Sequence, residues 1–453
     1  MNLLGKEVLI IGLGISGLST IKALNNLGAN ISVMDSKNEE DLKDILTNIQ
    51  DISIKKYFGT NIIDLNKVDL IVKSPGVPPN AEIIQKARKN NIEIITDIEL
   101  AFRLSPTEKI ITITGTNGKT TTTTLVGEIL KRAKFNTYIV GNIGVGILQE
   151  IVKSKPEDVF VVEASSFQLE DIKQFRPKVS LILNISPDHL DWHGSYENYI
   201  NAKKNIFKNQ GENDYIILNY DDKIIRNFKK EISANIIWFS LLQKLSRGIY
   251  LDGEDIIIND GIRENQLMSI TDIRILGKHN LENILGSIGI CYAMGIDSEI
   301  IKQGIEDFKG VEHRLEYVTE KKGICFYNDS KGTNPEASIK AIEAISTPII
   351  LIAGGYDKGV SFENFIKYFE NKVKSLILLG ETKEQIKNTA IEYGFQNYYL
   401  VDNMDEAVGL GYKLGRKGDS VLLSPACASW GMYKNFEERG KEFKKAVYRL
   451  KED

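Results

Sequence analysis

The sequence predicts an α/β protein of three domains, each built around a mostly parallel sheet. The length of 453 residues corresponds to about three domains at roughly 150 residues each. Short apolar runs alternate with amphipathic stretches along almost the whole chain, which is the pattern of repeated βαβ units. Glycine-containing turns also follow predicted strands at two places, near residues 12 and 115. Turns of this kind connect strands to helices in proteins that bind phosphate groups.

Composition and charge exclude several classes of protein. Apolar residues make up 42% and charged residues 26% of the chain, as in ordinary globular enzymes. The formal net charge of -4 lacks the basic excess of a nucleic-acid or acidic-membrane binder. No apolar stretch approaches the roughly 20 residues that a membrane span requires, and no signal-peptide pattern precedes the first strand. The chain has three cysteines, Cys291, Cys325 and Cys427, which lie far apart in the sequence. Such sparse cysteines are typical of cytoplasmic proteins, whose thiols are kept reduced. We therefore expect a cytoplasmic protein without membrane insertion.

The first predicted domain covers residues 1–97 and is Rossmann-like. A strand at Val8–Gly12 leads into Gly12–Gly17, which reads GLGISG, and Asp35 ends the next strand. This pattern is typical of a dinucleotide site in which the acidic residue binds a ribose hydroxyl. A domain that binds the diphosphate of a UDP-sugar has the same requirements, so both NAD and a UDP-sugar remain open at this point. The last strand of the domain is predicted at Ile94–Asp97.

The central predicted domain covers residues 98–309 and contains the most informative motif. A strand at Lys109–Thr114 is followed by Gly115–Thr120, which reads GTNGKT, and then by a helical pattern. This arrangement directs backbone N–H groups and the positive end of a helix at an anion. Lys119 would reach the phosphates of a nucleotide, and the Thr120 hydroxyl would bind Mg²⁺. The full phosphate-loop pattern has a glycine at the position that Ile113 occupies here.

Two further polar positions follow predicted strands of the central domain. Glu163 ends the strand 158–162, and His189 lies in the loop after the strand Val179–Ile185. Ligands bind at the carboxyl edge of parallel sheets, and a nucleotide loop requires an acidic partner for its metal. We expect Glu163 to be a second Mg²⁺ ligand and His189 to lie at the same edge. A helix is predicted at Ser298–Phe308 near the end of the domain.

The last predicted domain covers residues 310–453 and is also Rossmann-like. Its strands are expected at Ile324–Tyr327, Ile349–Ala353, Leu376–Leu379 and Val421–Leu423. Polar clusters follow these strands, and their cations and hydroxyl groups suit an anionic substrate. The clusters are Glu312–Arg314, Asn328–Asn334, Gly354–Lys358 and Ser424–Ser429.

Taken in order along the chain, these motifs resemble the Mur ligases, the ATP-dependent amino-acid-adding enzymes of peptidoglycan precursor synthesis. Gly115–Thr120 is similar to the ATP loop of the family, and Gly141–Gly144 and Glu163–Gln168 match segments that follow it. The resemblance implies ATP as co-substrate and two Mg²⁺ ions. The ATP contacts that it implies are Gly115, Thr116, Asn117, Gly118, Lys119, Thr120, Thr121, Asn280, Asn283, Arg314, Asp329 and Lys331.

The segments Ser424–Ser429 and Lys434–Gly440 are most similar to the branch of the family that adds D-glutamate. The resemblance then implies UDP-N-acetylmuramoyl-L-alanine as acceptor, so that the first domain binds UDP and no dinucleotide. The implied contacts of this acceptor are Gly14, Ile15, Ser16, Asp35, Ser36, Ser74, Pro75, Gly76 and Asn142. Those of D-glutamate are Thr333, Lys358, Ser429 and Phe436.

The family also carries a carbamylated lysine beside its metal. Tyr199-x-x-Ala202-Lys203 matches the surroundings of that lysine, and Lys204 is the alternative in the adjacent register. The metal ligands implied are Thr120, Glu163, His189 and Lys203 as its carbamate, and the catalytic residues are Lys119, His189 and Lys203. We expect a monomer that acts on small molecules and not on nucleic acid.

Other functions remain open on the residues alone. A nicotinamide-dependent oxidoreductase would use Gly12–Gly17 and Asp35, but it leaves Gly115–Thr120 unexplained. A nucleotide-binding module without catalysis is a third class, which ATP turnover would exclude. Within the ligases, the alternative is an enzyme that adds a different amino acid, or a folylpolyglutamate-type enzyme.

Overall fold

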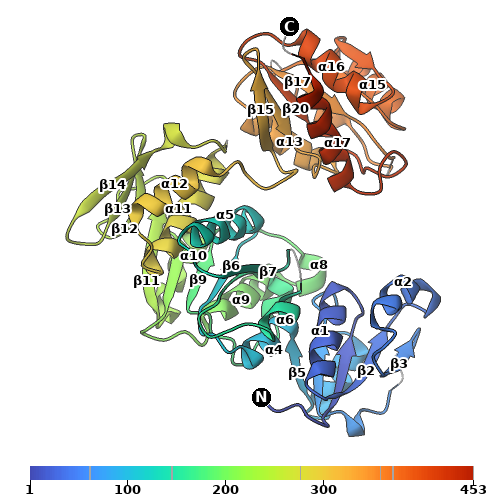
Figure 1. Ribbon diagram of the computed structural model, residues 1–453, viewed down its shortest axis with the longest axis vertical. Coiled ribbons are helices and arrows are strands. Elements are labelled where there is room, and N and C mark those ends of the chain that lie inside the picture. Colours follow the sequence, from blue (N-terminus) through green and yellow to red (C-terminus); the bar gives the residue numbers. More distant parts are fainter. Residues whose placement is uncertain (61–62, 144–145, 276, 358, 370–371, 452–453) are drawn as a thin grey trace. The chain divides into compact units, whose positions relative to one another are not determined.

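The computed structural model describes residues 1–60, 63–143, 146–275, 277–357, 359–369 and 372–451. Its strands form three sheets, which follow one another along the chain, and helices connect the strands of each sheet (Figure 1). Contacts between residues divide the chain into two compact units. One unit contains Met1–Thr271 and Leu281–Ile305, and the other contains Asp272–Asn280 and Glu306–Asp453. The predicted α/β class with three domains is confirmed, and the boundaries at residues 97 and 309 stay predictions.

The first sheet has five parallel strands in the order β3-β2-β1-β4-β5. Its central strands are buried, as parallel strands covered on both faces must be. The strands are β1 (Glu7–Ile11), β2 (Asn30–Asp35), β3 (Ile54–Phe58), β4 (Leu70–Lys73) and β5 (Glu93–Thr96). The helices are α1 (Ile15–Asn26), α2 (Lys43–Leu46), α3 (Glu82–Lys89) and α4 (Asp97–Leu104).

The central sheet has nine strands in the order β14-β13-β12-β11-β10-β9-β6-β8-β7. It is parallel from β7 to β12, and β13 and β14 add to its edge as an antiparallel hairpin. The strands are β6 (Ile110–Thr114), β7 (Thr137–Gly141), β8 (Val159–Glu163), β9 (Val179–Ile182), β10 (Tyr215–Asn219), β11 (Asn235–Ser240), β12 (Gly248–Asp252), β13 (Asp255–Asn259) and β14 (Glu264–Ser269). The helices are α5 (Lys119–Arg132), α6 (Ile147–Ile151), α7 (Ser166–Leu169), α8 (Leu190–His193), α9 (Tyr196–Lys204), α10 (Lys223–Asn227), α11 (Lys278–Ala293) and α12 (Ser298–Asp307).

The third sheet has six strands in the order β15-β16-β20-β17-β18-β19, and only the β15–β16 pair is antiparallel. The strands are β15 (Glu316–Lys321), β16 (Ile324–Asn328), β17 (Ile349–Ala353), β18 (Val373–Leu378), β19 (Tyr398–Leu400) and β20 (Ser420–Leu423). The helices are α13 (Pro335–Ala344), α14 (Glu363–Lys367), α15 (Lys383–Glu392), α16 (Met404–Leu414) and α17 (Phe436–Arg449).

One predicted strand is shorter than its apolar run. The run Val179–Ile185 forms β9 only as far as Ile182. Beyond it, the Asn184 carbonyl accepts a hydrogen bond from the Thr116 N–H at 3.0 Å, and the Asn184 side chain accepts one from the Asn117 N–H at 2.9 Å. The backbone carbonyl and the side chain of Asn184 therefore hold the Gly115–Thr120 loop, where the strand could otherwise have continued.

No helix among the described residues is long and apolar enough to cross a membrane. Cys291, Cys325 and Cys427 form no disulfide bond among the described residues.

Candidate active site

The Gly115–Thr120 loop joins β6 to α5, as predicted from the sequence. Gly118 precedes the first helical residue, Lys119, and has the left-handed φ of 85° that glycine adopts without strain. A Cβ atom at Gly118 would also lie 2.0 Å from Oδ1 of Asn283 on α11. The loop therefore requires glycine at this position for two reasons, its backbone conformation and the proximity of α11.

Lys119 is folded over this loop. Its ammonium donates hydrogen bonds to the carbonyls of Gly115 and Thr116, each at 2.9 Å. Thr120 and Thr121 lie in the first turn of α5, whose N–H groups have no partner within the helix. An anion such as a phosphate is bound well by this combination of a lysine, a loop and a helix N-terminus.

Glu163 ends β8, which pairs with β6, so its carboxylate lies at the same sheet edge as the loop. The side chain is 2% exposed. Its Oε1 accepts a hydrogen bond from the Asn142 side chain at 2.9 Å, and its buried Oε2 has no hydrogen-bond partner among the described residues. Carboxylate oxygens are the ligands that Mg²⁺ prefers, and an unpaired buried oxygen fits such an ion.

Lys203 comes from α9 and is the buried lysine of the predicted pair. Its Nζ donates to the Gly115 carbonyl at 2.9 Å and lies 3.3 Å from the Thr114 hydroxyl. Burial, together with repulsion from Lys119, holds the Lys203 pKa well below its ordinary value. Lys204 instead forms an ion pair with Glu231 and is more exposed. The structure thus places Lys203, and not Lys204, against the loop.

His189 lies in the segment between β9 and α8, at a positive φ of 50°. Its ring packs 4.8 Å from the ring of Phe167, and Nε2 is 3.5 Å from the Asp188 carboxylate. About half of its side chain is exposed. Among the described residues, no group of three His, Cys, Asp or Glu side chains is arranged to hold a metal by itself. A metal site here would therefore need ligands such as Thr120 or a modified Lys203 in addition to Glu163.

The glycine loop of the first domain is held by backbone and carboxylate contacts. Asp35 accepts hydrogen bonds from the N–H groups of Leu13 at 2.7 Å and Lys37 at 2.9 Å. Both of its oxygens thus bind the protein's own backbone, whereas a dinucleotide site uses this carboxylate on a ribose. The Ser74 hydroxyl donates to the Gly12 carbonyl at 2.7 Å, which brings Ser74–Gly76 beside the loop.

The remaining residues predicted to contact the acceptor lie around this loop, with one exception. Gly14 caps α1, Ile15 is 74% exposed, and Ser36 is exposed after β2. The Ser16 hydroxyl donates to the buried Asp97, which also accepts from Gln168 of the central domain. Asn142 is the exception, because it lies beside Glu163 at the central sheet edge.

In the second unit, the predicted ATP contacts lie on two adjoining loops. The Lys331 N–H donates to the His313 carbonyl at 2.9 Å, so the loop after β16 lies beside the segment that contains Arg314. Burial raises the pKa of Asp329 to about 7, and its carboxylate accepts from the Ser424 hydroxyl at 2.7 Å. Asn280 and Asn283 lie in the first turns of α11, where Asn280 belongs to the second unit and Asn283 to the first.

The predicted amino-acid contacts that the structure describes lie at the start of α17, after β16 and after β20. Phe436 is the first residue of this helix, so its N–H has no helical acceptor, and its carbonyl accepts from the Ser330 hydroxyl at 2.7 Å. Ser429 is buried after β20, and Thr333 lies two residues beyond Lys331. Lys358 lies outside the described residues.

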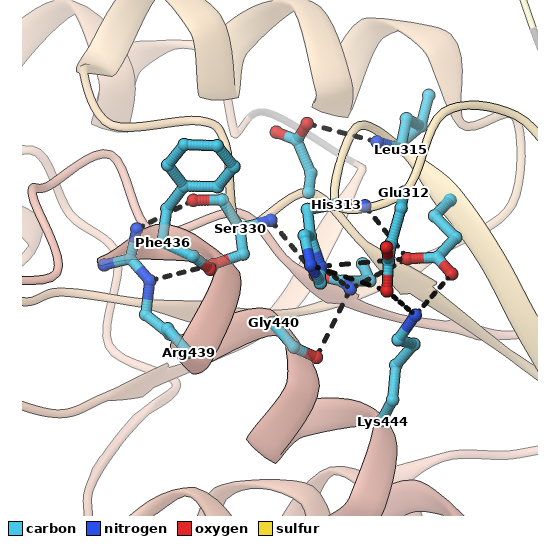
Figure 2. Close-up of polar contacts among 11 residues, drawn as sticks. Glu312, His313, Leu315, Ser330, Phe436, Arg439, Gly440 and Lys444 are labelled. Carbon is cyan, nitrogen blue, oxygen red and sulfur yellow. Dashed lines mark hydrogen bonds and ion pairs between the residues drawn. The ribbon is translucent and has the colours of Figure 1, made fainter. Parts of the chain in front are cut away.

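A buried arginine that sequence reasoning did not single out connects these loops. Arg439 on α17 is 2% exposed and donates to the Ser330 carbonyl at 2.8 Å and the Ser330 hydroxyl at 3.0 Å (Figure 2). It also donates to the Cys427 carbonyl at 3.1 Å. The loop after β16 and the loop after β20 are thus held by one side chain. In the sequence, Arg439 is one of several charged residues of α17. Its charge alone therefore did not indicate that it would be buried and would hold two loops.

Next to it, Figure 2 shows a second polar network around the buried His313. Its ring nitrogen Nδ1 lies 2.9 Å from the Asn328 side chain, which also donates to Glu316 at 3.0 Å. Lys444 of α17 forms ion pairs with Glu312 at 2.7 Å and Glu316 at 2.9 Å. The segment that leads into the third sheet is therefore fixed to β16 and α17.

Comparisons with known proteins point to one family along the whole chain. Three family models match consecutive segments: the MurD-like N-terminal domain of Mur ligases at 6–96, the Mur ligase middle domain at 113–291, and the glutamate ligase domain of Mur ligases at 313–427. Two curated relatives are named UDP-N-acetylmuramoylalanine–D-glutamate ligase. The one from Caldanaerobacter subterraneus subsp. tengcongensis is 48% identical and the one from Clostridioides difficile 49% identical, and each alignment covers 100% of both chains.

Solved structures show the same fold at low sequence identity. The crystal structure of UDP-N-acetylmuramate-alanine ligase MurC from Thermotoga maritima has a TM-score of 0.58 at 18% identity, covering 98% of this chain and 100% of that one. MurF ligase from Thermotoga maritima in complex with ADP has a TM-score of 0.53 at 18% identity, with 99% of both chains covered. These matches confirm the fold, and the family models and full-length relatives confirm the resemblance found in the sequence. The chain belongs to the Mur ligase family.

Proposed function

We propose that this chain is an ATP-dependent ligase that adds D-glutamate to UDP-N-acetylmuramoyl-L-alanine in peptidoglycan precursor synthesis. The observation that carries the proposal is the arrangement at the central sheet edge, where Lys119, the unpaired oxygen of Glu163 and the buried Lys203 lie around one phosphate loop. The full-length relatives named for this activity support the choice of acceptor and amino acid.

The reaction that this site suits begins with activation of a carboxylate. The alanyl carboxylate of the acceptor attacks the γ-phosphorus of ATP, the bond to the β-phosphate oxygen breaks, and ADP leaves. Lys119 and the N–H groups at the start of α5 stabilise the negative charge on the transferring phosphoryl group. The acyl phosphate then has a leaving group that a free carboxylate lacks.

The second step forms the amide. The neutral amine of D-glutamate attacks the acyl carbon, the tetrahedral intermediate expels phosphate, and the amine loses a proton. The α17 N-terminus and Ser429 would bind the carboxylates of glutamate through charge-assisted hydrogen bonds, together with Thr333 and Lys358. A site built around these charges rejects an amino acid that lacks the second carboxylate, because its polar groups would be left unpaired.

We further propose that Lys203 is carbamylated. Burial and the nearby Lys119 lower the pKa of Lys203, which favours its neutral amine, and a neutral amine is the form that adds to CO₂. The carbamate would be an anion, and so Glu163, Thr120, His189 and the modified Lys203 would hold two Mg²⁺ ions. Such ions supply positive charge that stabilises the phosphoryl group during transfer.

The first-domain loops would bind the UDP part of the acceptor. In this assignment, the α1 N-terminus and Ser74–Gly76 face the diphosphate and Asp35 keeps the loop in shape. Because two of the three substrates are nucleotides found inside cells, we place the reaction in the cytoplasm. We expect the protein to act as a monomer, which size-exclusion chromatography with light scattering measures.

The test is phosphate release by the purified chain with ATP, Mg²⁺ and UDP-N-acetylmuramoyl-L-alanine against a panel of amino acids in both enantiomers. We expect release that depends on D-glutamate, with mass spectrometry showing the amide product. Equal activity with D-alanine or L-lysine would overturn the D-glutamate assignment and leave the ligase assignment intact. Glutamate addition to a folate would instead favour the folylpolyglutamate-type alternative.

A further inference from the structure

Lys73 is a fully buried lysine at the end of β4, directly before Ser74–Gly76. Its side chain is 0% exposed. A lone ammonium buried in this way is strongly destabilising unless an anion accompanies it. A lysine at the end of the apolar run Leu70–Val72 therefore needs a specific partner.

The partner comes from the central domain. Nζ of Lys73 lies 2.6 Å from Oδ2 of Asp171, which follows α7 and is itself buried. The other oxygen of Asp171 pairs with Arg88 of α3 at 2.9 Å. Burial acts to raise the pKa of Asp171, but attraction to Lys73 and Arg88 outweighs it and the pKa is lowered. One carboxylate of the central domain thus pairs with two cations of the first domain.

Lys73 also contacts the segment that contains His189. Its Nζ lies 5.3 Å from the ring centroid of Trp192 on α8, within the range of a cation–π contact. The buried Trp192 N–H has no hydrogen-bond acceptor among the described residues. The position of the Trp192 ring therefore depends on packing and on its contact with the Lys73 ammonium.

The Trp192 ring is part of a continuous aromatic cluster. Phe167 lies 4.5 Å from Trp192 and 4.8 Å from His189, measured between ring centroids. His193 packs against Trp192 at 4.5 Å, and its Nε2 is 2.9 Å from the Ser166 hydroxyl. A shift of Trp192 would consequently move Phe167 and the His189 segment.

We propose that Lys73 is a positioning residue, which fixes the His189 segment relative to the Ser74–Gly76 loop through Asp171 and Trp192. The inference rests on the proposed function, because it assigns the loop to the acceptor nucleotide and His189 to the reacting end. Lys73 is then the buried connection between the two ends of one substrate. Its loss would misplace the reacting carboxylate while the nucleotide-binding loop stays intact.

The experiment compares wild type with Lys73→Met and with the double variant Lys73→Met/Asp171→Leu. The double variant replaces the buried ion pair by apolar side chains, a change that is often neutral for stability, so it provides a folded protein if the single variant unfolds. Lys86→Met on α3 is the matched control, because the ion pair of Lys86 with Glu82 is exposed. For each protein, kcat and the KM for each nucleotide substrate are measured. In addition, labelling with 5-fluorotryptophan gives a ¹⁹F resonance for Trp192, which the Trp192→Phe variant assigns.

We expect both Lys73 variants to lose about tenfold to a hundredfold in kcat, with little change in KM for either nucleotide, since a misplacement near 1 Å has this cost. The Trp192 resonance should shift in both, and Lys86→Met should match wild type in each measurement. A double variant with wild-type kcat and an unshifted Trp192 resonance would overturn the inference and reduce Lys73 to half of a structural ion pair. If wild type itself shows no D-glutamate-dependent turnover, the proposed function fails instead, and the ¹⁹F result still decides whether Lys73 positions Trp192.

Discussion

Replacing Arg439 by Met tests whether one buried side chain holds the loop after β16 and the loop after β20 of the second unit. Three hydrogen bonds are lost, to two carbonyls and a hydroxyl. Bonds from a charged donor contribute about 1.5–3 kcal/mol each, so the gross loss is on the order of 5–9 kcal/mol. Burial opposes this, because it lowers the pKa of Arg439 to about 10, which corresponds to a cost of about 3 kcal/mol for the charged form.

The difference leaves a net destabilisation of about 2–6 kcal/mol, which includes the range of about 3–5 kcal/mol found when one partner of a buried ion pair is removed. We also expect KM for D-glutamate to rise about tenfold, because the Ser330 and Cys427 loops lose their common anchor. Urea unfolding followed by fluorescence and steady-state kinetics measure the two effects. The control is Arg449→Met on the same helix, whose pair with Asp405 is exposed and should contribute less than about 1 kcal/mol. An Arg439 variant as stable as the control, with unchanged KM, would refute this reasoning.

Further predictions concern the phosphate loop, the modified lysine and the pH dependence of stability. Lys119→Ala should reduce turnover by about a hundredfold or more in a protein that stays folded by circular dichroism, and near-normal phosphate release would contradict the loop assignment. Lys203→Ala should abolish most activity while Lys204→Ala does not, and mass spectrometry of native wild type should show the added mass of CO₂; an unmodified, fully active preparation would exclude the carbamate. Burial lowers the pKa of His193 to about 4, so between that pH and about 6.5 only the unfolded chain binds the proton, and the first unit should lose up to about 3 kcal/mol as pH falls through this window. Burial raises the pKa of Asp329 to about 7, so the second unit should be more stable at about pH 4 and lose up to about 4 kcal/mol as pH rises to about 7. Calorimetry across this pH range should show that the stabilities of the two units change with pH in opposite directions. His193→Gln should remove the pH dependence of the first unit, and Asp329→Asn that of the second. If the pH dependence of a unit persists in its variant, another group is responsible for it.

Sequence reasoning predicted the α/β class and the strands that lead to the functional loops. Those strands are continuous apolar runs bounded by glycine or polar residues, such as the one that forms β17, Ile349–Ala353, and this pattern depends only on local sequence. It did not predict the end of β9 at Ile182, because residues 183–186 are also apolar in part. They leave the sheet to bond the phosphate loop, which is a tertiary contact.

The residues of the candidate site also divide into those that sequence motifs predicted and those that only the folded chain reveals. Lys119, Glu163 and Lys203 come from motifs, and the structure brings all three to one sheet edge. Lys73 and Arg439 are positioning residues whose partners lie far away in sequence, 98 residues for the pair of Lys73 with Asp171 and 109 for that of Arg439 with Ser330. Only the folded chain shows such pairs, although a lysine within an apolar strand is itself a signal that an anion is needed.

The division into two units has a consequence for dissecting the protein into fragments. The second unit takes Asp272–Asn280 from the middle of the chain as well as Glu306–Asp453, so the backbone passes between the units at three places. Within it, Ile275 contacts Gly310, at 3.4 Å from the position of a Cβ there. A fragment cut at the apparent linker near residue 310 would therefore lack a part of its own structure. The boundary between the units also divides α11, whose first residues belong to the second unit and whose remainder belongs to the first. Binding studies on isolated domains of this chain would be better made with a circularly permuted or full-length protein than with a simple truncation.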